Sequence, residues 1–321
     1  MPIKKRDPTV TGKIVHPWLP SEPCPCGKGK LFAFCCRRPD GGIYKTVTWP
    51  VPPAPATGHT KTGCYMNWTE DCCSSLSGEH FVSQGVLTLL GEKHVAVNGA
   101  HWLPFGVTRA LPISGLKGNI LCTRHNSAMS PLDSAAVKFF SSIKSIYNDL
   151  GDSKTLSRKR QWWLVSGEEI ELWLLKTAFG LYYSGNVAKD GKKLCDVQRI
   201  NRVLMDALQG SPILPPCGVY VMDLKNRSFD PNTLDFTSLS SDNNEAMVGL
   251  QFRFLGLSLL VLLDPSTVYT EAFLASHTYR PNYLLFRNRN RQRTHAIVLT
   301  WPRSAERKAV LFDAIGPAFR G

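Results

Sequence analysis

The chain has 321 residues, 43% of them hydrophobic, which suits about two globular domains with a proper core. Its 38 Lys and Arg residues outnumber the 25 Asp and Glu residues, and the net charge of +13 favours a polyanionic partner such as nucleic acid. No apolar run follows the charged start at 1–6, and the longest apolar run, 254–263, is too short for a bilayer. These features argue against a secreted or membrane protein, so we expect a cytoplasmic protein without a membrane partner.

Cysteine usage indicates metal binding. Ten cysteines are present, and eight of them lie before residue 123 in closely spaced groups. Such spacing is typical of metal sites in a reducing compartment rather than of disulfides. The other two, Cys195 and Cys217, stand apart and are expected to be ordinary buried thiols.

The first group of cysteines lies in residues 18–41 and follows the pattern C-x-C-x8-C-C. Gly27 and Gly29 permit the tight turn that brings both cysteine pairs to one ion. Basic residues surround the cysteines, which suits a contact with phosphates or with a protein partner. The pattern resembles the SEC-C zinc motif, and the resemblance implies one structural zinc with four ligands: Cys24, Cys26, Cys35 and Cys36.

Residues 42–57 are rich in proline and are expected to form a stiff linker, which places the next domain at 58–150. That domain holds a Glu79-His80 pair and, further on, Asn126. Hydrolysis of a phosphodiester needs a base that takes the proton of water and a cation that neutralises the leaving oxygen. Imidazole is a base at pH 7 and Mg²⁺ prefers oxygen ligands. His80 is therefore the candidate base, and Glu79 and Asn126 are candidate ligands of the cation.

The run that begins at Glu79-His80, together with the later run from Asn119 to Asn126, resembles the HNH nuclease family. The resemblance implies a ββα-metal, treble-clef-like fold that cuts nucleic acid with one Mg²⁺ or Mn²⁺ ion. It implies that His80 is the general base, that Glu79 and Asn126 bind the catalytic ion, and that Asn119 holds the hairpin loop. Neighbouring residues of an ideal strand face opposite ways, so the resemblance also implies a distorted hairpin at Glu79-His80.

Many members of that family carry a structural zinc that fastens the hairpin to the helix. Here Cys122 and His125 supply one pair of ligands. Cys64 supplies the other pair together with Cys72, and Cys73 is the alternative to Cys72. A closed site of thiolate and imidazole ligands is structural and separate from the catalytic ion. The chain is therefore expected to bind two structural zinc ions.

Residues 83–118 form an insertion within the expected hairpin, with a short helix at 86–90 and a strand at 95–97. After Asn126, Ser130 and Pro131 match the N-cap and the first position of a helix. We therefore predict a helix over 131–150 whose apolar side covers the hairpin.

Residues 160–321 are expected to form a further α+β domain. The pattern predicts helices at 168–183 and 199–208, and strands at 219–222, 248–263, 283–286 and 296–299. Between the last two strands, alternating arginines suggest a hairpin tip that either grips phosphates or forms a solvated turn: Arg287, Arg289, Arg291 and Arg293. Trp162 and Trp163 could stack on bases, but core packing is favoured.

The chain is thus predicted to be an α+β protein with a SEC-C module, a central HNH-like domain and a C-terminal α+β domain. The resemblance implies a metal-dependent endonuclease, a hydrolase of DNA phosphodiesters of the kind used in host defence against foreign DNA. The alternative is a non-catalytic adaptor with two zinc ions that binds nucleic acid or protein, in which Glu79 has removed metal-dependent cleavage. A third alternative is a translocation or ribosome-associated factor that uses the SEC-C module for protein contact.

Overall fold

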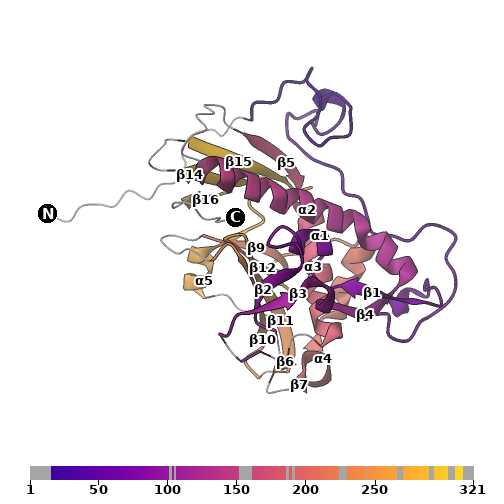
Figure 1. The fold of residues 1–321 in the computed structure, drawn as a ribbon. Helices are drawn as coiled ribbons and strands as arrows, with labels where there is room; N and C mark the ends of the chain where they lie inside the picture. Colours follow the sequence, from indigo (N-terminus) through magenta and orange to yellow (C-terminus); the bar gives the residue numbers. More distant parts are fainter. Residues whose placement is uncertain are drawn as a thin grey trace.

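The computed structural model describes residues 16–100, 103–104, 106–151, 161–185, 188–189, 192–223, 230–243, 245–265, 270–288, 293–302 and 308–313. It is a mixed α+β structure, as the sequence predicts. Two long helices, α2 (Thr123–Gly151) and α3 (Gly167–Ser184), pack against each other, and both contact a four-stranded sheet (Figure 1). Helix α3 also contacts a larger, eight-stranded sheet.

The eight-stranded sheet has the order β13-β9-β12-β11-β10-β2-β3, with β8 paired to β11. Most of its strands come from the C-terminal half of the chain: β8 (Arg199–Ile200), β9 (Gly218–Met222), β10 (Thr233–Ser240), β11 (Ala246–Phe254), β12 (Leu257–Leu262) and β13 (His277–Tyr279). The other two, β2 (His94–Asn98) and β3 (Arg109–Pro112), come from the insertion.

The four-stranded sheet has the order β16-β14-β15-β5. Its strands are β5 (Trp162–Ser166), β14 (Tyr283–Asn288), β15 (Arg293–Thr300) and β16 (Ala309–Asp313). The N-terminal cysteine module packs on this sheet, because Phe32 and three of its cysteines share a buried cluster with Leu164, Leu285 and Val298. Trp162 lies at the border of that cluster, which agrees with the expected packing role.

The antiparallel pair β1 (Leu76–His80) and β4 (Lys117–Cys122) leads directly into α2. Its register is irregular between Ser77 and Glu79, which confirms the predicted distortion of the hairpin. The remaining elements are short: η1 (Phe32–Phe34), η2 (Asn67–Thr69), η3 (Ile113–Gly115), η4 (Arg202–Gln209), α1 (Gln84–Leu87), α4 (Leu194–Val197), α5 (Glu271–Ser276), β6 (Ala188–Lys189) and β7 (Lys192–Lys193).

Helix α2 begins at Thr123, eight residues before the predicted start at Pro131. Proline in a helix has no N–H for the carbonyl four residues earlier, which is that of Ser127. The Ser130 hydroxyl donates to the Ser127 carbonyl instead, at 2.8 Å. This side-chain bond offsets the missing backbone bond, so the helix runs through a residue that more often marks a start.

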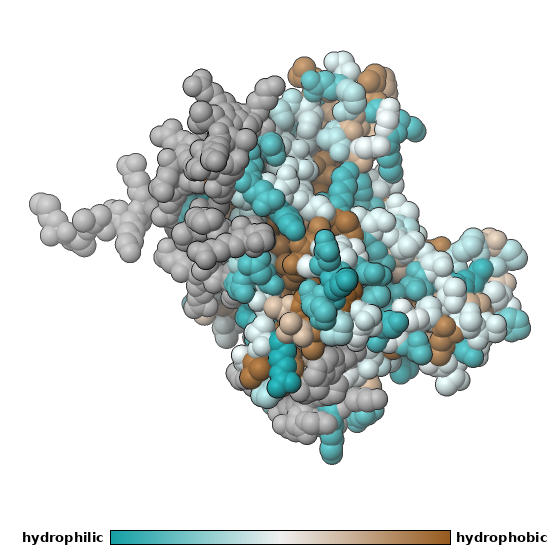
Figure 2. All heavy atoms as spheres, in the orientation of Figure 1, coloured by the Kyte–Doolittle hydropathy of each residue, from teal (hydrophilic) through white to brown (hydrophobic). Residues whose placement is uncertain are grey.

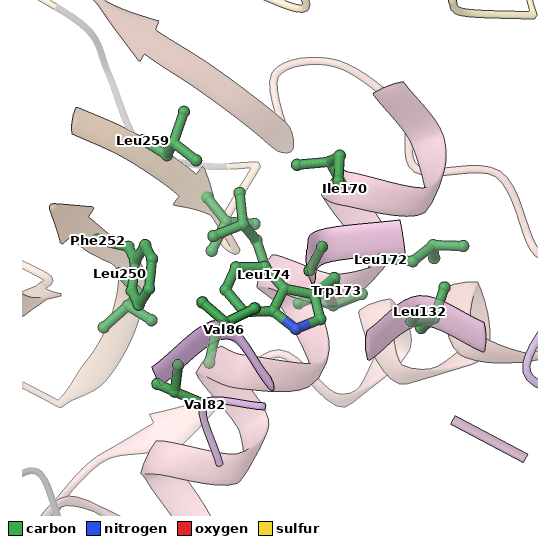
Figure 3. Close-up of a cluster of buried hydrophobic side chains, with 14 of the residues drawn as sticks. Val82, Val86, Leu132, Ile170, Leu172, Trp173, Leu174, Leu250, Phe252 and Leu259 are labelled. Carbon is green, nitrogen blue, oxygen red and sulfur yellow. The ribbon is translucent and has the colours of Figure 1, made fainter. Parts of the chain in front are cut away.

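Helix α3 matches the predicted 168–183 helix but is enclosed on nearly all sides rather than amphipathic. The side chain of Ser166 caps its start by accepting from the Glu169 N–H. Trp173, fully buried, packs its ring against Phe140 of α2 and Phe252 of β11. Figure 3 shows Trp173 among aliphatic side chains from several elements, including Val82 and Val86 of the insertion.

The insertion joins the two halves of the chain into one structure. Strand β2 pairs in parallel with β10, with Ala96 opposite Thr233. Gly99, at φ +86°, permits this approach, because a Cβ there would lie 1.9 Å from the Phe236 carbonyl oxygen. One buried core extends from Val47 to Phe312. The predicted division between domains 58–150 and 160–321 therefore does not separate two cores.

The remaining sequence predictions agree with the structure in part. Strands are found at 219–222, 283–286 and 296–299, and β2 covers the strand at 95–97. The predicted strand 248–263 is a hairpin, β11 and β12, which turns at Leu255 and Gly256 with φ of 50° and 74°. The predicted helix at 199–208 is the 3₁₀ helix η4. The arginine-rich stretch does connect an antiparallel pair, β14 and β15.

On the face drawn in Figure 2, hydrophobic residues gather in patches among hydrophilic ones. Several large apolar side chains are exposed, among them Phe34, Trp49, Trp68 and Val203. Within the described ranges, no helix has the length and apolar character needed to cross a membrane.

Candidate metal sites

The first cysteine cluster is built by a short loop. Cys24, Cys26, Cys35 and Cys36 place their sulfur atoms within 4.8 Å of one another. Gly27 and Gly29 take φ of 84° and 72°, the left-handed turn that the sequence predicts. The Sγ atoms of Cys26 and Cys35 are 3.4 Å apart. Four thiols gathered in this way could hold a zinc ion.

The second cluster joins two parts of the chain that the insertion separates. Cys64, Cys72, Cys122 and His125 are all buried, and their donor atoms lie within 4.8 Å of one another. The Nδ1 atom of His125 is 3.6, 3.7 and 3.2 Å from the sulfurs of Cys64, Cys72 and Cys122 respectively. In a tetrahedral zinc site, the bond lengths place sulfur and nitrogen ligands about 3.5 Å apart. The geometry therefore fits a zinc ion.

The environment of His125 selects the tautomer that binds metal. The Thr69 hydroxyl donates to the Met66 carbonyl at 2.9 Å, so its oxygen is an acceptor for the Nε2–H of His125, 3.0 Å away. A proton on Nε2 leaves the lone pair of Nδ1 directed at the three sulfurs. Burial also lowers the pKa of His125, which favours the neutral imidazole that a metal requires.

Cys72, rather than Cys73, belongs to the cluster. The sulfur of Cys73 lies instead 3.3 Å from the Arg124 backbone N–H, which donates to it. The sulfur of Cys73 also lies near Ser75. Adjacent residues in an extended segment point in opposite directions, so only one of the pair can face the buried site.

The predicted catalytic Glu79 is directed into the protein interior. Its carboxylate lies 2.6 Å from the ammonium nitrogen of Lys176 on α3, and both side chains are almost fully buried. Lys176 also donates to both oxygens of Asp133 on α2, at 2.7 and 2.8 Å. The Ser83 hydroxyl donates to Asp133 and accepts from the Trp173 N–H. We call Glu79, Asp133 and Lys176 the lysine–carboxylate triad.

Lys176 carries a permanent charge in this site. Burial by itself lowers the pKa of a lysine, but Asp133 and Glu79 outweigh it, so that the pKa of Lys176 is raised. The ammonium has three N–H groups and three carboxylate oxygens around it, which satisfies all of its donors. The carboxylate of Glu79 is therefore already neutralised by the chain itself. In this arrangement it does not fit a divalent cation.

The predicted base, His80, is half-buried. It hydrogen-bonds to the backbone of Ile113, and its Nε2 atom has no partner among the described residues. Burial is the main reason that the pKa of His80 is lowered, with further contributions from Lys117 and Lys176. The imidazole is thus neutral at pH 7, as a base must be, but its free nitrogen is enclosed.

The other two predicted site residues, Asn119 and Asn126, are more exposed to solvent than Glu79. Asn119 is exposed on β4, where its side chain lies beside Gly78 of β1 and lines a cavity of about 620 Å³ with Tyr65 and Trp68. Asn126 lies in the first turns of α2 and is half-buried. The described contacts thus give Glu79 an internal cation as its partner and leave Asn119 at the surface.

Only part of the arginine-rich hairpin can be placed. Arg287 is half-buried and forms an ion pair with Asp313 of β16, 3.0 Å away. Arg293 begins β15, whereas Arg289 and Arg291 lie outside the described residues. The phosphate contact predicted for this group stays a prediction.

The positive charge of the chain is unevenly distributed along the sequence. The described residues include 23 Lys and Arg and 21 Asp and Glu, a net charge of only +2. The remaining +11 of the total +13 comes from sequence segments outside the described ranges, chiefly 1–15 and 152–160 with +3 each and 224–229 and 289–292 with +2 each. The described part is therefore close to neutral, and these segments hold the basic excess.

Several residues of the site were missed at the level of sequence. Lys176 is the one charged residue of the sequence run 172–182, and a charge in an enclosed helix requires an acidic partner, so this signal was available. Asp133, three residues after Ser130, matches only the acid of a helix start in the sequence. No protein-family model, curated protein or solved structure matches the chain.

Proposed function

We propose that the chain is a double-zinc protein that binds nucleic acid, with DNA the first ligand to test, and that its ββα unit is a scaffold rather than a hydrolytic centre. The observation that carries this proposal is the lysine–carboxylate triad. A catalytic cation at Glu79 would have to displace an ammonium that makes three short contacts in the interior. Leaving a charged lysine buried without partners costs several kcal/mol.

The basic segments support the choice of nucleic acid as partner. Residues 152–160, with four basic residues, precede β5, and residues 289–292, with two arginines, connect β14 to β15. Strand β5 runs parallel to β15 from Trp162, which is opposite Ala296. The described residues that follow the two segments, Trp162 and Arg293, therefore lie at the same end of the four-stranded sheet. Segments rich in Lys and Arg favour a phosphate backbone as partner.

Fluorescence anisotropy with labelled duplex DNA over a range of salt concentrations tests this function. The double variant Arg289→Ala, Arg291→Ala is expected to reduce the slope of log K against log salt by about 1 to 2 units. The matched control replaces Lys93, which precedes β2, and Arg109 of β3, both of them exposed, and should leave the slope unchanged. Binding that does not respond to salt at all would refute the proposal.

A metal-dependent endonuclease is the second candidate, favoured by the chain order β1, β4, α2 with a buried cluster of zinc ligands at their junction. The Nε2 atom of His80, which has no partner within the described part of the chain, also agrees with it. The test is cleavage of plasmid DNA with Mg²⁺ or Mn²⁺, with and without EDTA. A base contributes about 10²- to 10⁴-fold to such a rate. Cleavage by the wild type that His80→Ala abolishes would replace the first proposal with this one.

Metal titration separates the two candidates without a substrate. If the triad is structural, calorimetry should detect no Mg²⁺ or Mn²⁺ binding to the zinc-loaded wild type. Lys176→Met frees the carboxylates of Glu79 and Asp133, which are suitable ligands of a hard cation. Mn²⁺ should therefore raise the melting temperature of that variant only. The same rise in melting temperature in the wild type would indicate that a metal ion can displace the Lys176 ammonium.

A further inference from the structure

A cavity of about 610 Å³ lies at the start of α3. None of its lining residues belongs to a cysteine cluster or to the lysine–carboxylate triad. Six parts of the chain form the cavity: the linker at Trp49, the start of α3, the loop 210–215, residues 279–280, residues 301–302 and Lys308. Its volume lies in the range of about 300–1,000 Å³ typical of small-molecule sites.

The wall of this cavity is held by a buried ion pair. The guanidinium of Arg280 binds the carboxylate of Glu171 through two contacts of 2.9 and 2.7 Å and donates to the Ile213 carbonyl at 2.9 Å. The Glu171 carboxylate also accepts from the Val219 N–H. Two-point pairing of this kind fixes the plane of the guanidinium.

The backbone here is adapted to the ion pair. Arg280 takes φ of 42°, a left-handed conformation that is costly for a residue with a side chain. Gly218, at φ +123°, leaves room for Glu171, since a Cβ there would lie 2.4 Å from its Oε1 atom. Residues held in such conformations cluster at binding and active sites. The arrangement therefore suggests a preformed site rather than a gap in packing.

Two of the aromatic rings in the wall are already covered by a cation. Arg280 lies over Tyr279 and over Trp301, with distances of 5.0 and 5.5 Å to the ring centroids. A ligand that needs an aromatic cage for its own positive charge is thereby disfavoured. Trp49, which also lines the cavity, is 41% exposed, so its indole ring can stack on a ligand. A flat, uncharged ring is the group that suits this surface.

The polar groups of the cavity include Glu168 as an acceptor and Arg280, Ser211 and Lys308 as donors. Glu168 receives the Tyr44 hydroxyl on Oε2 at 2.7 Å, and no contact of its Oε1 atom is recorded within the described residues. Burial is the main reason that the pKa of Glu168 is raised, so its carboxylate gains from a further donor. The Nη1 group of Arg280 likewise has no recorded acceptor in the described part of the chain.

We propose that this cavity binds a guanine base stacked on Trp49, with Glu168 accepting from its N1–H and N2–H groups and Arg280 donating to its O6 and N7 atoms. Guanine is the base with two adjacent donors on one edge and two adjacent acceptors on the other. Adenine offers only one donor to the carboxylate. The base could belong to a free nucleotide or to a nucleic-acid strand, and only the second source rests on the proposed function.

The test measures quenching of tryptophan fluorescence in the zinc-loaded full chain by GMP and by AMP, and then by short single strands that contain guanine or lack it. GMP should bind the wild type at least about 10-fold more tightly than AMP, because a base with one donor leaves one oxygen of the half-buried Glu168 carboxylate unpaired. Trp49→Ala should weaken GMP about 5- to 100-fold, the usual contribution of a stacked base. Glu168→Gln should remove the preference for GMP over AMP.

Trp68→Ala is the matched control, because Trp68 is 45% exposed and borders the other cavity. It should bind GMP like the wild type. Equal affinity for GMP and AMP, or an unchanged affinity in Trp49→Ala, overturns the inference. GMP binding that persists while duplex DNA fails to bind would separate this site from the proposed function and assign it to a free nucleotide.

Discussion

Replacing Lys176 by Met tests the lysine–carboxylate triad directly. Met keeps most of the length of the side chain but leaves Glu79 and Asp133 without the ammonium that now lies 2.6 to 2.8 Å from their oxygens. Removing one partner of a buried ion pair costs about 3–5 kcal/mol. A typical domain has a total free energy of unfolding of roughly 5–15 kcal/mol. The variant should thus fold but be much less stable.

Urea unfolding of zinc-loaded protein, followed by tryptophan fluorescence, measures this loss at pH 7.5 and 5.5. In the variant, two like charges share a buried site, so one carboxyl holds a proton more firmly when folded than when unfolded. A folded-state pKa above the unfolded value stabilises the folded protein at low pH, and this stabilisation is lost as the pH rises. The difference in stability between wild type and Lys176→Met should therefore be smaller at pH 5.5 than at pH 7.5.

Two further variants complete the test. Lys117→Met removes an exposed lysine of β4 and should change stability by less than about 0.5 kcal/mol. Glu79→Gln in the Lys176→Met background removes one of the uncompensated charges and should restore part of the loss. A loss under about 1 kcal/mol at pH 7.5, measured against the 3–5 kcal/mol expected for a buried pair, would refute the reasoning.

Three other outcomes are expected. Elemental analysis should give two zinc per chain for the wild type and for Cys73→Ser, but one for Cys122→Ser, whose central region should also lose its cooperative unfolding. Gly218→Ala should destabilise the protein by about 1–3 kcal/mol in thermal unfolding, because its Cβ would collide with Glu171. Because the pKa of His80 is lowered, its neutral form stabilises the fold above the unfolded pKa of about 6.5. Wild type should therefore lose more stability than His80→Gln when the pH falls from 7 to 5.5.

The elements that the sequence predicted well are those whose signal is local. The turn glycines Gly27 and Gly29, the C-x2-H pair at Cys122 and His125, and the apolar run of α3 all act over a few residues. Local signals gave the wrong helix start at Pro131, because the Ser130 hydroxyl bonds to the Ser127 carbonyl and the helix continues through the proline. They were also weak for β10, whose alternating residues resemble a polar loop until β2 and β11 pair with both edges.

Glu79 shows that a motif does not by itself give the partners of a residue. Residue types at 79, 80 and 126 follow the pattern of a cation site, but the neighbour that decides the charge of Glu79 is Lys176, 97 positions later. No spacing rule connects the two, because the contact exists only after α3 packs on the hairpin. Likewise Trp49, Glu168 and Arg280 meet in one cavity from three distant segments.

The pairing of β2 with β10 has a consequence for the synthesis of the chain. Ala96 leaves the ribosome 137 residues before its partner Thr233. At about 5–20 residues per second, this delay lasts roughly 7–27 s. During that time the edge of β2 that later pairs with β10 has backbone groups without a strand partner. An open strand edge of this kind promotes association with other chains. A nascent chain of this protein is therefore expected to need a chaperone until its second half has emerged.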